Sequence, residues 1–186
     1  KVGPSRQMVG AGYGYDTRAY RLGSLDKVTK FEVDQHCMSL KKQKKCRDAI
    51  PVCKELTHVS TNFNKERVAD ALLNSPRFDR SLPTFFLWES AAVCLSDESV
   101  DEIFANLREI HKVTNTAHYL YFTFRDKRII DEEARKKIYG REEFFNHAAG
   151  LGEKGLSNGL DPSRISQYLA DRGFTIYDLF LLPKEI

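Results

Sequence analysis

The stretch VGAGYGYDTR, residues 9–18, decides the fold of this chain. Gly10, Gly12 and Gly14 directly follow a short apolar segment, Arg6 to Ala11, which we predict to be a strand. Glycines at this point let the chain turn tightly and let the backbone approach a ligand closely. Taken alone the loop is a weak signal, because a glycine-rich turn between any strand and helix would look the same.

A carboxylate stands at the end of the next strand. Lys27 to Asp34 (KVTKFEVD) alternates and is rich in β-formers, which predicts a strand ending 20 residues after Gly14. A carboxylate there can accept hydrogen bonds from both hydroxyls of an adenosine ribose. Loop, spacing and acid together predict a ribose-bearing cofactor; in the alternative interpretation Asp34 only caps the following helix.

The spacing of the glycines separates the cofactor classes. A dinucleotide site follows G-x-G-x-x-G, but the third glycine position is Tyr15 when counted from Gly10 and Thr17 when counted from Gly12. The observed G-x-G-x-G suits the amino-acid part of S-adenosyl-L-methionine, which has no phosphate. A nicotinamide-binding oxidoreductase is therefore the weaker alternative, and the P-loop pattern G-x-x-x-x-G-K-[ST] is absent.

Strand-like and helix-like segments alternate outward from the loop. Pro83 to Trp88 is a continuous apolar run, as in a strand buried on both faces. Asp97 to Lys112 carries the apolar stripe of a helix. The alternation predicts one α/β domain over residues 1–186, with a mostly parallel sheet and helices on both faces. The other predicted strands are His58 to Thr61, Ala117 to Phe124 and Phe174 to Leu182, and the other predicted helices are Asp16 to Leu22, Gln35 to Arg47, Asn64 to Leu73, Asp131 to Phe145 and one starting at Asp161-Pro162.

Bulk properties restrict the class of protein. The net charge of +3 does not indicate nucleic-acid binding, and no apolar run approaches the roughly 20 residues that span a bilayer. Lys41 to Arg47 is a basic run, interpreted as the solvated face of a helix, with a phosphate or acidic-partner patch as the alternative. The four cysteines and five histidines show no metal-ligand spacing, so no metal is expected. A cytoplasmic location is expected, and an organelle stays open because the sequence starts at Lys1.

Four segments resemble the leucine carboxyl methyltransferase family. QMVGAGYGYDTRAYRL, Gln7 to Leu22, is similar to the family's glycine turn with its Asp-Thr-Arg and apolar helix. FEVDQ, Phe31 to Gln35, matches the second-strand motif, and Phe78 to Ser90 resembles the fourth strand. Leu160 to Phe174 resembles the late helix, so the resemblance covers nearly the whole chain. It implies a Rossmann-like class I methyltransferase fold.

The resemblance also implies a site for S-adenosyl-L-methionine. The glycine loop would approach the methionine part, the strand-end acid would hold the ribose, and the end of the third strand would border the adenine. Glu89 and Tyr13 are the catalytic candidates, with a strand-end ion pair and core packing as their plainer alternatives. The cofactor-binding candidates are Gly10, Gly12, Gly14, Asp16, Arg18, Asp34, Gln35, Asn62, Phe63 and Glu89.

The implied reaction is methyl transfer to an oxygen, with a carboxylate as the expected acceptor. A carboxylate is ionised near neutral pH and needs no general base, so catalysis would consist mainly of aligning it with the methyl group. A protein carboxyl terminus and a small-molecule acid are both candidate acceptors. A modified tRNA side chain also stays open.

Departures from the family pattern support a second hypothesis. Few residues precede the glycine loop, where the family has an N-terminal lid region; Asn62 replaces an aspartate beside the adenine, and Ser90 replaces a glycine. The sequence stops at Ile186, just after the sixth predicted strand, so the family's last antiparallel strand is in doubt. The sheet edge would then be available to a partner chain. The alternative function is a catalytically inactive methyltransferase-like subunit with a structural or interaction role in a larger assembly.

Overall fold

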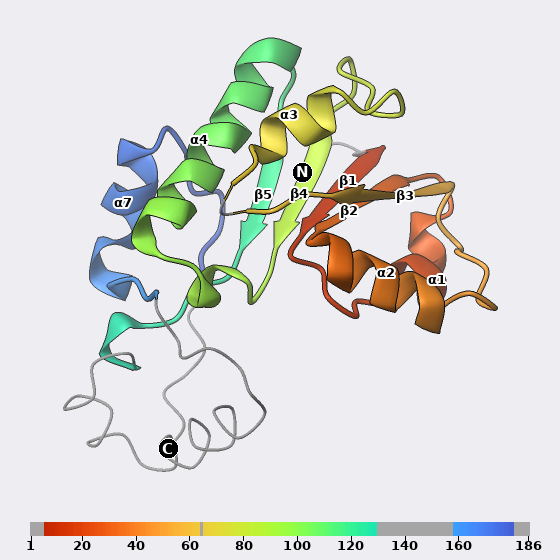
Figure 1. Ribbon diagram of the computed structural model, residues 1–186. Helices are drawn as coiled ribbons and strands as arrows, with labels where there is room; N and C mark the ends of the chain where they lie inside the picture. The colour runs from red at the N-terminus through yellow and green to blue at the C-terminus, as the bar shows by residue number, and fades with distance from the viewer. Residues whose placement is uncertain (1–5, 64, 130–157, 181–186) are drawn as a thin grey trace.

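A computed structural model describes residues 6–63, 65–129 and 158–180, and five strands form one sheet in the described part. All neighbouring strands are parallel, in the order β3-β2-β1-β4-β5 (Figure 1). Parallel pairing of this kind requires crossover connections, which the intervening helices supply. The strands are β1 (Gln7–Ala11), β2 (Thr29–Asp34), β3 (Glu55–Ser60), β4 (Thr84–Trp88) and β5 (Tyr119–Phe122).

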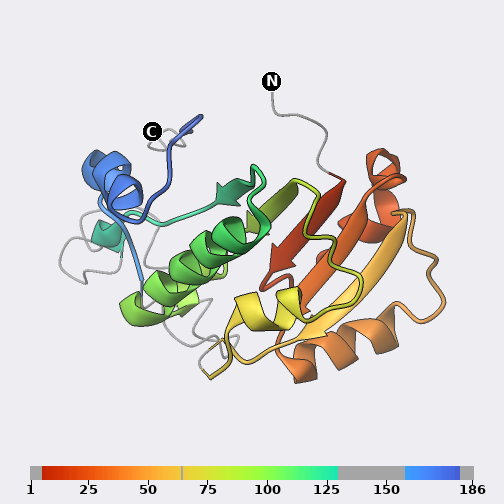
Figure 2. The same ribbon diagram turned by 90° about the horizontal axis from the view of Figure 1, so that it is seen from above.

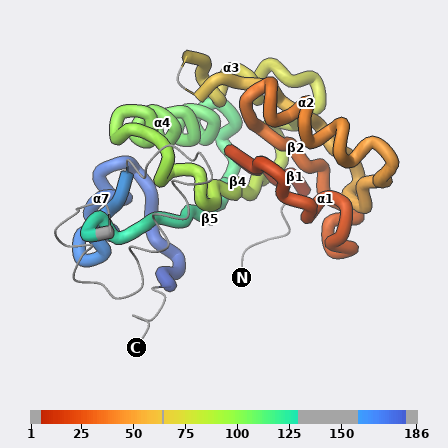
Figure 3. Tube along the Cα trace, turned by 60° about the horizontal axis from the view of Figure 1, so that its bottom comes forward, coloured from red at the N-terminus to blue at the C-terminus, as the bar shows by residue number. Residues whose placement is uncertain are grey.

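Helices lie at both ends of the sheet. Figures 1 and 3 show α1 and α2 beside β2 and β3, whereas α7 lies next to α4 at the β5 end. Figure 2 shows α4 running along the sheet next to β4 and β5. The α-helices are α1 (Arg18–Arg21), α2 (His36–Lys45), α3 (Val68–Leu73), α4 (Asp97–Thr114) and α7 (Ile165–Asp171), and short 3-10 turns span Gly23–Leu25, Ala92–Cys94, Lys127–Ile129 and Pro162–Arg164.

The two faces of β2 differ in chemistry. Phe31 and Val33 are fully buried in the apolar core that includes residues of α3 and α4. Successive side chains of a strand point to opposite faces, so Lys30 and Glu32 lie on the other face, where they are also fully buried. Lys42 of α2 reaches Glu32 from that side, with Nζ 2.7 Å from Oε1. One face of the sheet is therefore packed by apolar contacts and the other contains buried charges.

The predicted helix after β4 is confirmed as α4. Ser96 caps its N-terminus by accepting a hydrogen bond from the backbone N–H of Ser99. The residues of the expected apolar stripe are all buried: Val100, Ile103, Phe104, Leu107 and Ile110. Asn106 is buried too, and its Oδ1 accepts a hydrogen bond of 3.0 Å from the N–H of Ala69, in the first turn of α3. A side chain of α4 thus satisfies a backbone donor of α3 that has no partner within its own helix.

The parallel α/β architecture predicted from the sequence is confirmed, although several element boundaries differ and one predicted strand is wrong. β3 begins at Glu55, three residues before the predicted start at His58. The strand predicted over Phe174 to Leu182 is wrong for the described residues 174–180, which have no strand structure. Phe174 packs on Phe104 of α4, at 5.2 Å between ring centroids, instead of extending the sheet. The predicted helix over residues 131–145 lies outside the described residues.

The late helix starts where the sequence predicted, as the 3-10 turn Pro162–Arg164 that continues into α7. The Asp161 side chain accepts a hydrogen bond from the N–H of Ser163, and Pro162 opens the first turn. Gly173 follows the end of α7 with a φ of +81°, a conformation that ends helices. None of the helices in the described ranges is both long and apolar enough to cross a bilayer.

Candidate functional site

A cavity of about 340 Å³ opens where the strand order reverses, between β1 and β4. In open α/β sheets this reversal leaves a crevice at the carboxyl ends of the strands, where ligands bind. The volume lies within the range of small-molecule sites. The lining residues come from the ends of β1 and β4 and from the loops that follow them: Gly10, Ala11, Gly12, Tyr13, Asp16, Arg18, Leu87, Glu89 and Ser90.

Two glycines of the loop after β1 have left-handed backbone conformations. Gly12 has a φ of +65° and Gly14 a φ of +51°. A Cβ on Gly12 would lie 2.6 Å from the Cβ of Ala91, whereas a Cβ on Gly14 would meet nothing within 4 Å. Gly12 is therefore required both by its backbone conformation and by the close approach of the segment after β4. Its N–H donates to the carbonyl of Val33, 2.9 Å away, which fixes the loop to β2.

Asp34 fastens the glycine loop from the end of β2. The residue is 7% exposed, and its Oδ2 accepts a hydrogen bond of 2.8 Å from the N–H of Gly14. Its Oδ1 accepts a second hydrogen bond, of 2.7 Å, from the N–H of Gln35. The N-cap of α2 is Gln35, and no side chain caps that helix, so Asp34 does not act as its cap. Each carboxylate oxygen keeps a further lone pair as an acceptor.

Arg18 bridges two acids at the rim of the cavity. Its Nε lies 2.9 Å from Oδ1 of Asp16, and its Nη2 lies 2.6 Å from Oε2 of Glu89. Burial opposes ionisation of Asp16, but hydrogen bonds from Arg18 and the charge of Lys30 outweigh it and hold the pKa of Asp16 below its ordinary value. Residues that are far apart in the sequence therefore form one charged group beside the glycine loop.

Tyr13 borders the cavity, but its hydroxyl turns toward the sheet. The hydroxyl lies 3.2 Å from Nδ1 of His58, and the residue is 8% exposed. Burial is the main reason that the pKa of Tyr13 rises to about 12. Burial likewise lowers the pKa of His58. At neutral pH the phenol of Tyr13 is therefore protonated, and its hydroxyl and Nδ1 of His58 share one hydrogen bond.

The structure brings together six of the eleven predicted site residues in the cavity lining. Five are not in the lining: Gly14, in the loop after β1, and Asp34, Gln35, Asn62 and Phe63, at or just after the ends of β2 and β3. The lining also includes Ala11, Leu87 and Ser90, which were not among the predicted site residues. Ser90 has a φ of +59°, which explains why a glycine is usual there in the family that the chain resembles. That replacement was the signal that could have identified Ser90.

The basic run after β2 is divided between solvent and interior. Four of its five cationic side chains are exposed, as expected of a solvated helix face. Lys42 is the exception: it is fully buried, with its Nζ 4.3 Å from the centroid of the Tyr13 ring. The prediction of a solvated face is wrong for this residue because it lies on the side of α2 that faces the sheet. The exposed members are Lys41, Lys44, Lys45 and Arg47.

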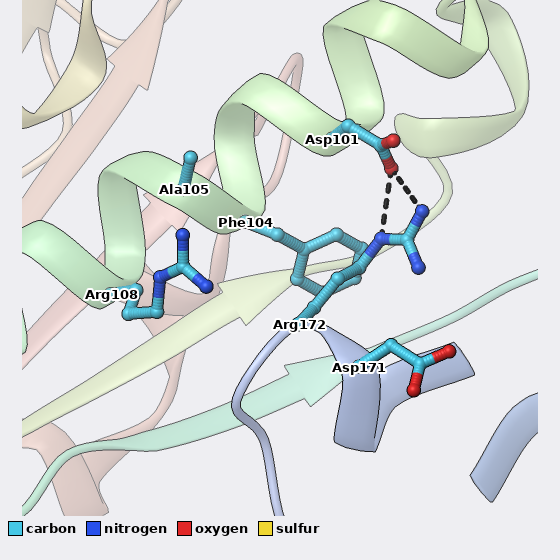
Figure 4. Close-up of a pocket in the computed structure, with 6 residues that line it drawn as sticks. All are labelled: Asp101, Phe104, Ala105, Arg108, Asp171 and Arg172. Carbon is cyan, nitrogen blue, oxygen red and sulfur yellow. Dashed lines mark hydrogen bonds and ion pairs between the residues drawn. The ribbon is translucent and has the colours of Figure 1, made fainter. Parts of the chain in front are cut away.

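A second cavity, of about 330 Å³, lies between α4 and the end of α7 (Figure 4). Nε and Nη2 of Arg172 donate to Oδ1 of Asp101 at 2.8 and 2.6 Å, and Nη1 donates to the carbonyl of Tyr168. The guanidinium thus has partners at all three nitrogens. All of its lining residues among those described belong to α4 or to the end of α7, and we interpret the cavity as a groove of helix packing. The lining residues are Asp101, Phe104, Ala105, Arg108, Asp171 and Arg172.

No group of three His, Cys, Asp or Glu side chains suited to a metal ion occurs within the described ranges. The four cysteines are free thiols, and only Cys53 is buried. The groups that the described residues offer at the candidate site are therefore the glycine backbone, the ion pairs of Arg18 and the carboxylate of Asp34.

Comparisons with known proteins agree with this fold. The family model for leucine carboxyl methyltransferase matches residues 3–108. The fold is similar to that of a DUF574 family protein from Streptomyces avermitilis, at 13% identity and a TM-score of 0.59. It is also similar to magnesium protoporphyrin IX methyltransferase from Synechocystis with bound SAH, at 14% identity and a TM-score of 0.54. An O-methyltransferase family protein from Burkholderia thailandensis aligns at 9% identity and a TM-score of 0.57.

The chain aligns with only part of each of these structures. The alignments cover 88%, 94% and 95% of this chain but only 60%, 67% and 48% of the respective structures. At such identities the structures support the fold, a Rossmann-like class I methyltransferase fold, and not a particular substrate. No curated protein matches the chain in sequence.

Proposed function

The chain belongs to the leucine carboxyl methyltransferase family, and from this premise we propose that it is an S-adenosyl-L-methionine-dependent O-methyltransferase acting on a carboxylate. The observation that carries the proposal is the cavity at the reversal of strand order, walled by glycines and fastened by Asp34. A family of methyltransferases implies a methyl donor and an acceptor, and this cavity is the place in the described structure suited to the donor.

The residues present fit S-adenosyl-L-methionine better than a nucleotide with phosphates. Arg18 is the one cationic side chain that the described residues contribute to the lining, and an arginine already shared by two carboxylates cannot balance the two charges of a pyrophosphate, whereas the amino-acid end of S-adenosyl-L-methionine is a zwitterion. A pyrophosphate would need free N–H groups at a helix start or unpaired basic residues. The lone pairs that remain on Asp34 suit two ribose hydroxyls, with Gln35 beside them, and we assign Asn62 and Phe63 to the border of the adenine.

The bound cofactor would supply an electrophilic methyl group, and the protein would align the acceptor with it. We assign Gly10, Gly12 and Gly14 to the methionine part of the site, because a backbone without side chains leaves room for it. Glu89, 39% exposed at its side chain, stands at the rim and faces the cofactor or the acceptor. Tyr13 shapes the wall, with its hydroxyl engaged by His58. A carboxylate acceptor would attack without a base, which agrees with the absence of a nucleophile–base pair in the lining.

Isothermal titration calorimetry with S-adenosyl-L-methionine and NAD tests the cofactor. We expect binding of the former only, and we expect Asp34→Ala to weaken it by about 1.5–3 kcal/mol, the range for hydrogen bonds to a charged group. Asp26→Ala, an exposed acid after a turn, is the matched control and should bind as the unchanged protein does. Binding of NAD instead, or an affinity unaltered by Asp34→Ala, would refute the assignment of the site.

The acceptor is tested with a labelled methyl group. Peptides with a free carboxyl terminus, the same peptides amidated, and small organic acids are offered as acceptors. A carboxyl methyltransferase would form a base-labile methyl ester on the free carboxylates and none on the amidated peptides. Methylation of both peptides alike would place the reaction at another group.

One observation favours the second candidate, a methyltransferase-like subunit without activity. β5 is the outermost strand of the described sheet, and no strand of the described residues pairs with its outer edge. Tyr121 on this strand is 46% exposed, and Tyr177 and Phe180 are 78% and 80% exposed. Exposed edges and aromatic residues suit a partner chain. Cofactor binding without any methyl transfer, combined with stable association with another chain, would favour this candidate.

A further inference from the structure

Charged side chains form a continuous ladder from the rim of the cavity into the interior. Acids and bases alternate along it, and each lies within 3.2 Å of the next. The ladder passes from the end of β4 through α1, the glycine loop and β2 to α2. In order, its members are Glu89, Arg18, Asp16, Lys30, Glu32 and Lys42. The distances between successive charged atoms along this order are 2.6, 2.9, 3.2, 3.2 and 2.7 Å.

The inner half of the ladder is withdrawn from water. Lys30, Glu32 and Lys42 are each 0% exposed. Removing such ions from water costs several kcal/mol each, and their mutual attraction often does no more than offset it. A buried ladder is therefore weak evidence for stability, but it holds its members in fixed positions. The outer members, Arg18 and Glu89, are 28% and 39% exposed at their side chains and line the cavity.

The guanidinium of Arg18 keeps unused donors. Its Nε donates to Asp16 and its Nη2 donates to Glu89. Its Nη1 has no hydrogen-bond partner within the described part of the chain. A guanidinium has five N–H donors in a rigid planar arrangement, and carboxylates are its preferred partners. The second oxygen of Glu89 is an acceptor for an ammonium in the same place.

We propose that Arg18 binds the carboxylate of the cofactor's amino-acid moiety and that the buried Lys30 is the residue that positions it. The inference rests on the proposed function, because it assigns a role within the same site. Lys30 donates to Oδ2 of Asp16, and Oδ1 of Asp16 accepts from Nε and from the backbone N–H of Arg18. Asp16 is thus held on both oxygens, and it fixes the plane of the guanidinium.

Two thioether ligands separate this role from general binding. S-adenosylhomocysteine and methylthioadenosine share the adenosine and the sulfur, but only the first has the amino-acid carboxylate and ammonium. We expect Arg18→Met to weaken the binding of S-adenosylhomocysteine by about 10- to 100-fold. The affinity for methylthioadenosine should stay within about twofold of that of the unchanged protein, which is the scatter of such measurements. Arg21→Met is the control: Arg21 is exposed, lies on the same short helix and does not line the cavity.

Lys30→Met tests the positioning role. Glu32 keeps Lys42 as a partner and Asp16 keeps Arg18, so no acid is left unpaired. Thermal unfolding checks that the variant is folded. We expect it to lower the ratio of S-adenosylhomocysteine to methylthioadenosine affinity in the same direction as Arg18→Met, which a merely structural role would not do.

The outcomes distinguish the inference from the proposed function. If the unchanged protein binds neither ligand, the cofactor assignment fails and the inference fails with it. If it binds both, but Arg18→Met weakens both equally or neither, the inference alone is wrong. If Arg18→Met behaves as expected while folded Lys30→Met leaves the affinity ratio unchanged, Lys30 is not the positioning residue.

Discussion

Replacing Gly12 by alanine should destabilise the protein more than the same change at Gly14. Both residues have a positive φ, so both variants share a backbone cost of about 1–2 kcal/mol. Only at residue 12 would the new Cβ meet another atom, the Cβ of Ala91 at 2.6 Å. Overpacking of this kind costs roughly 1–3 kcal/mol. Gly12→Ala should therefore cost about 2–5 kcal/mol and Gly14→Ala about 1–2 kcal/mol.

Urea unfolding of the two variants measures this difference directly. A third variant isolates the contact: Gly12→Ala combined with Ala91→Gly removes the clashing carbon and should recover the overpacking part of the loss. The double-mutant cycle should give a coupling of about 1–3 kcal/mol between residues 12 and 91, as for other residues in contact. Equal losses at Gly12 and Gly14, or no recovery in the double variant, would refute the argument that the segment after β4 requires the glycine.

Two further predictions concern stability away from the cavity. Asn106→Ala should cost about 1–3 kcal/mol in urea unfolding, because it leaves the buried N–H of Ala69 without its acceptor; the exposed Asn74→Ala serves as control, and equal losses would argue against this role. Burial, with a smaller contribution from His111, lowers the pKa of His118 from 6.5 to about 4, and its Nδ1 accepts from the N–H of Thr84. Between these two pH values the unfolded chain binds more protons, so stability should fall as the pH is lowered through this window. His118→Asn should reduce this loss of unfolding free energy by about 1–2 kcal/mol, allowing for partial exposure of the ring. If the unfolding free energy of both proteins changes equally with pH in this window, the assignment to His118 is wrong.

The sequence by itself determined the parallel α/β architecture and the glycine loop that lines one side of the candidate site. The period of two in Lys27 to Asp34, the glycine spacing after β1 and the apolar stripe of α4 are local patterns. Local patterns reflect backbone geometry within one segment, which neighbouring residues largely set. For that reason the helix start at Asp161-Pro162 and its end at Gly173 were also predictable.

Only the tertiary structure decided which distant segments meet. It set β4 beside β1, and thereby brought Glu89 to Arg18 across 71 residues of sequence. No local pattern indicated that Lys42 would be buried against Glu32, because a lysine in a basic run has the same sequence context whether its helix face meets water or a sheet. Residues 174–180 have a strand-like sequence but no strand structure, because a strand also requires a backbone partner. Pairing and burial depend on the packing of whole elements, which no local period contains.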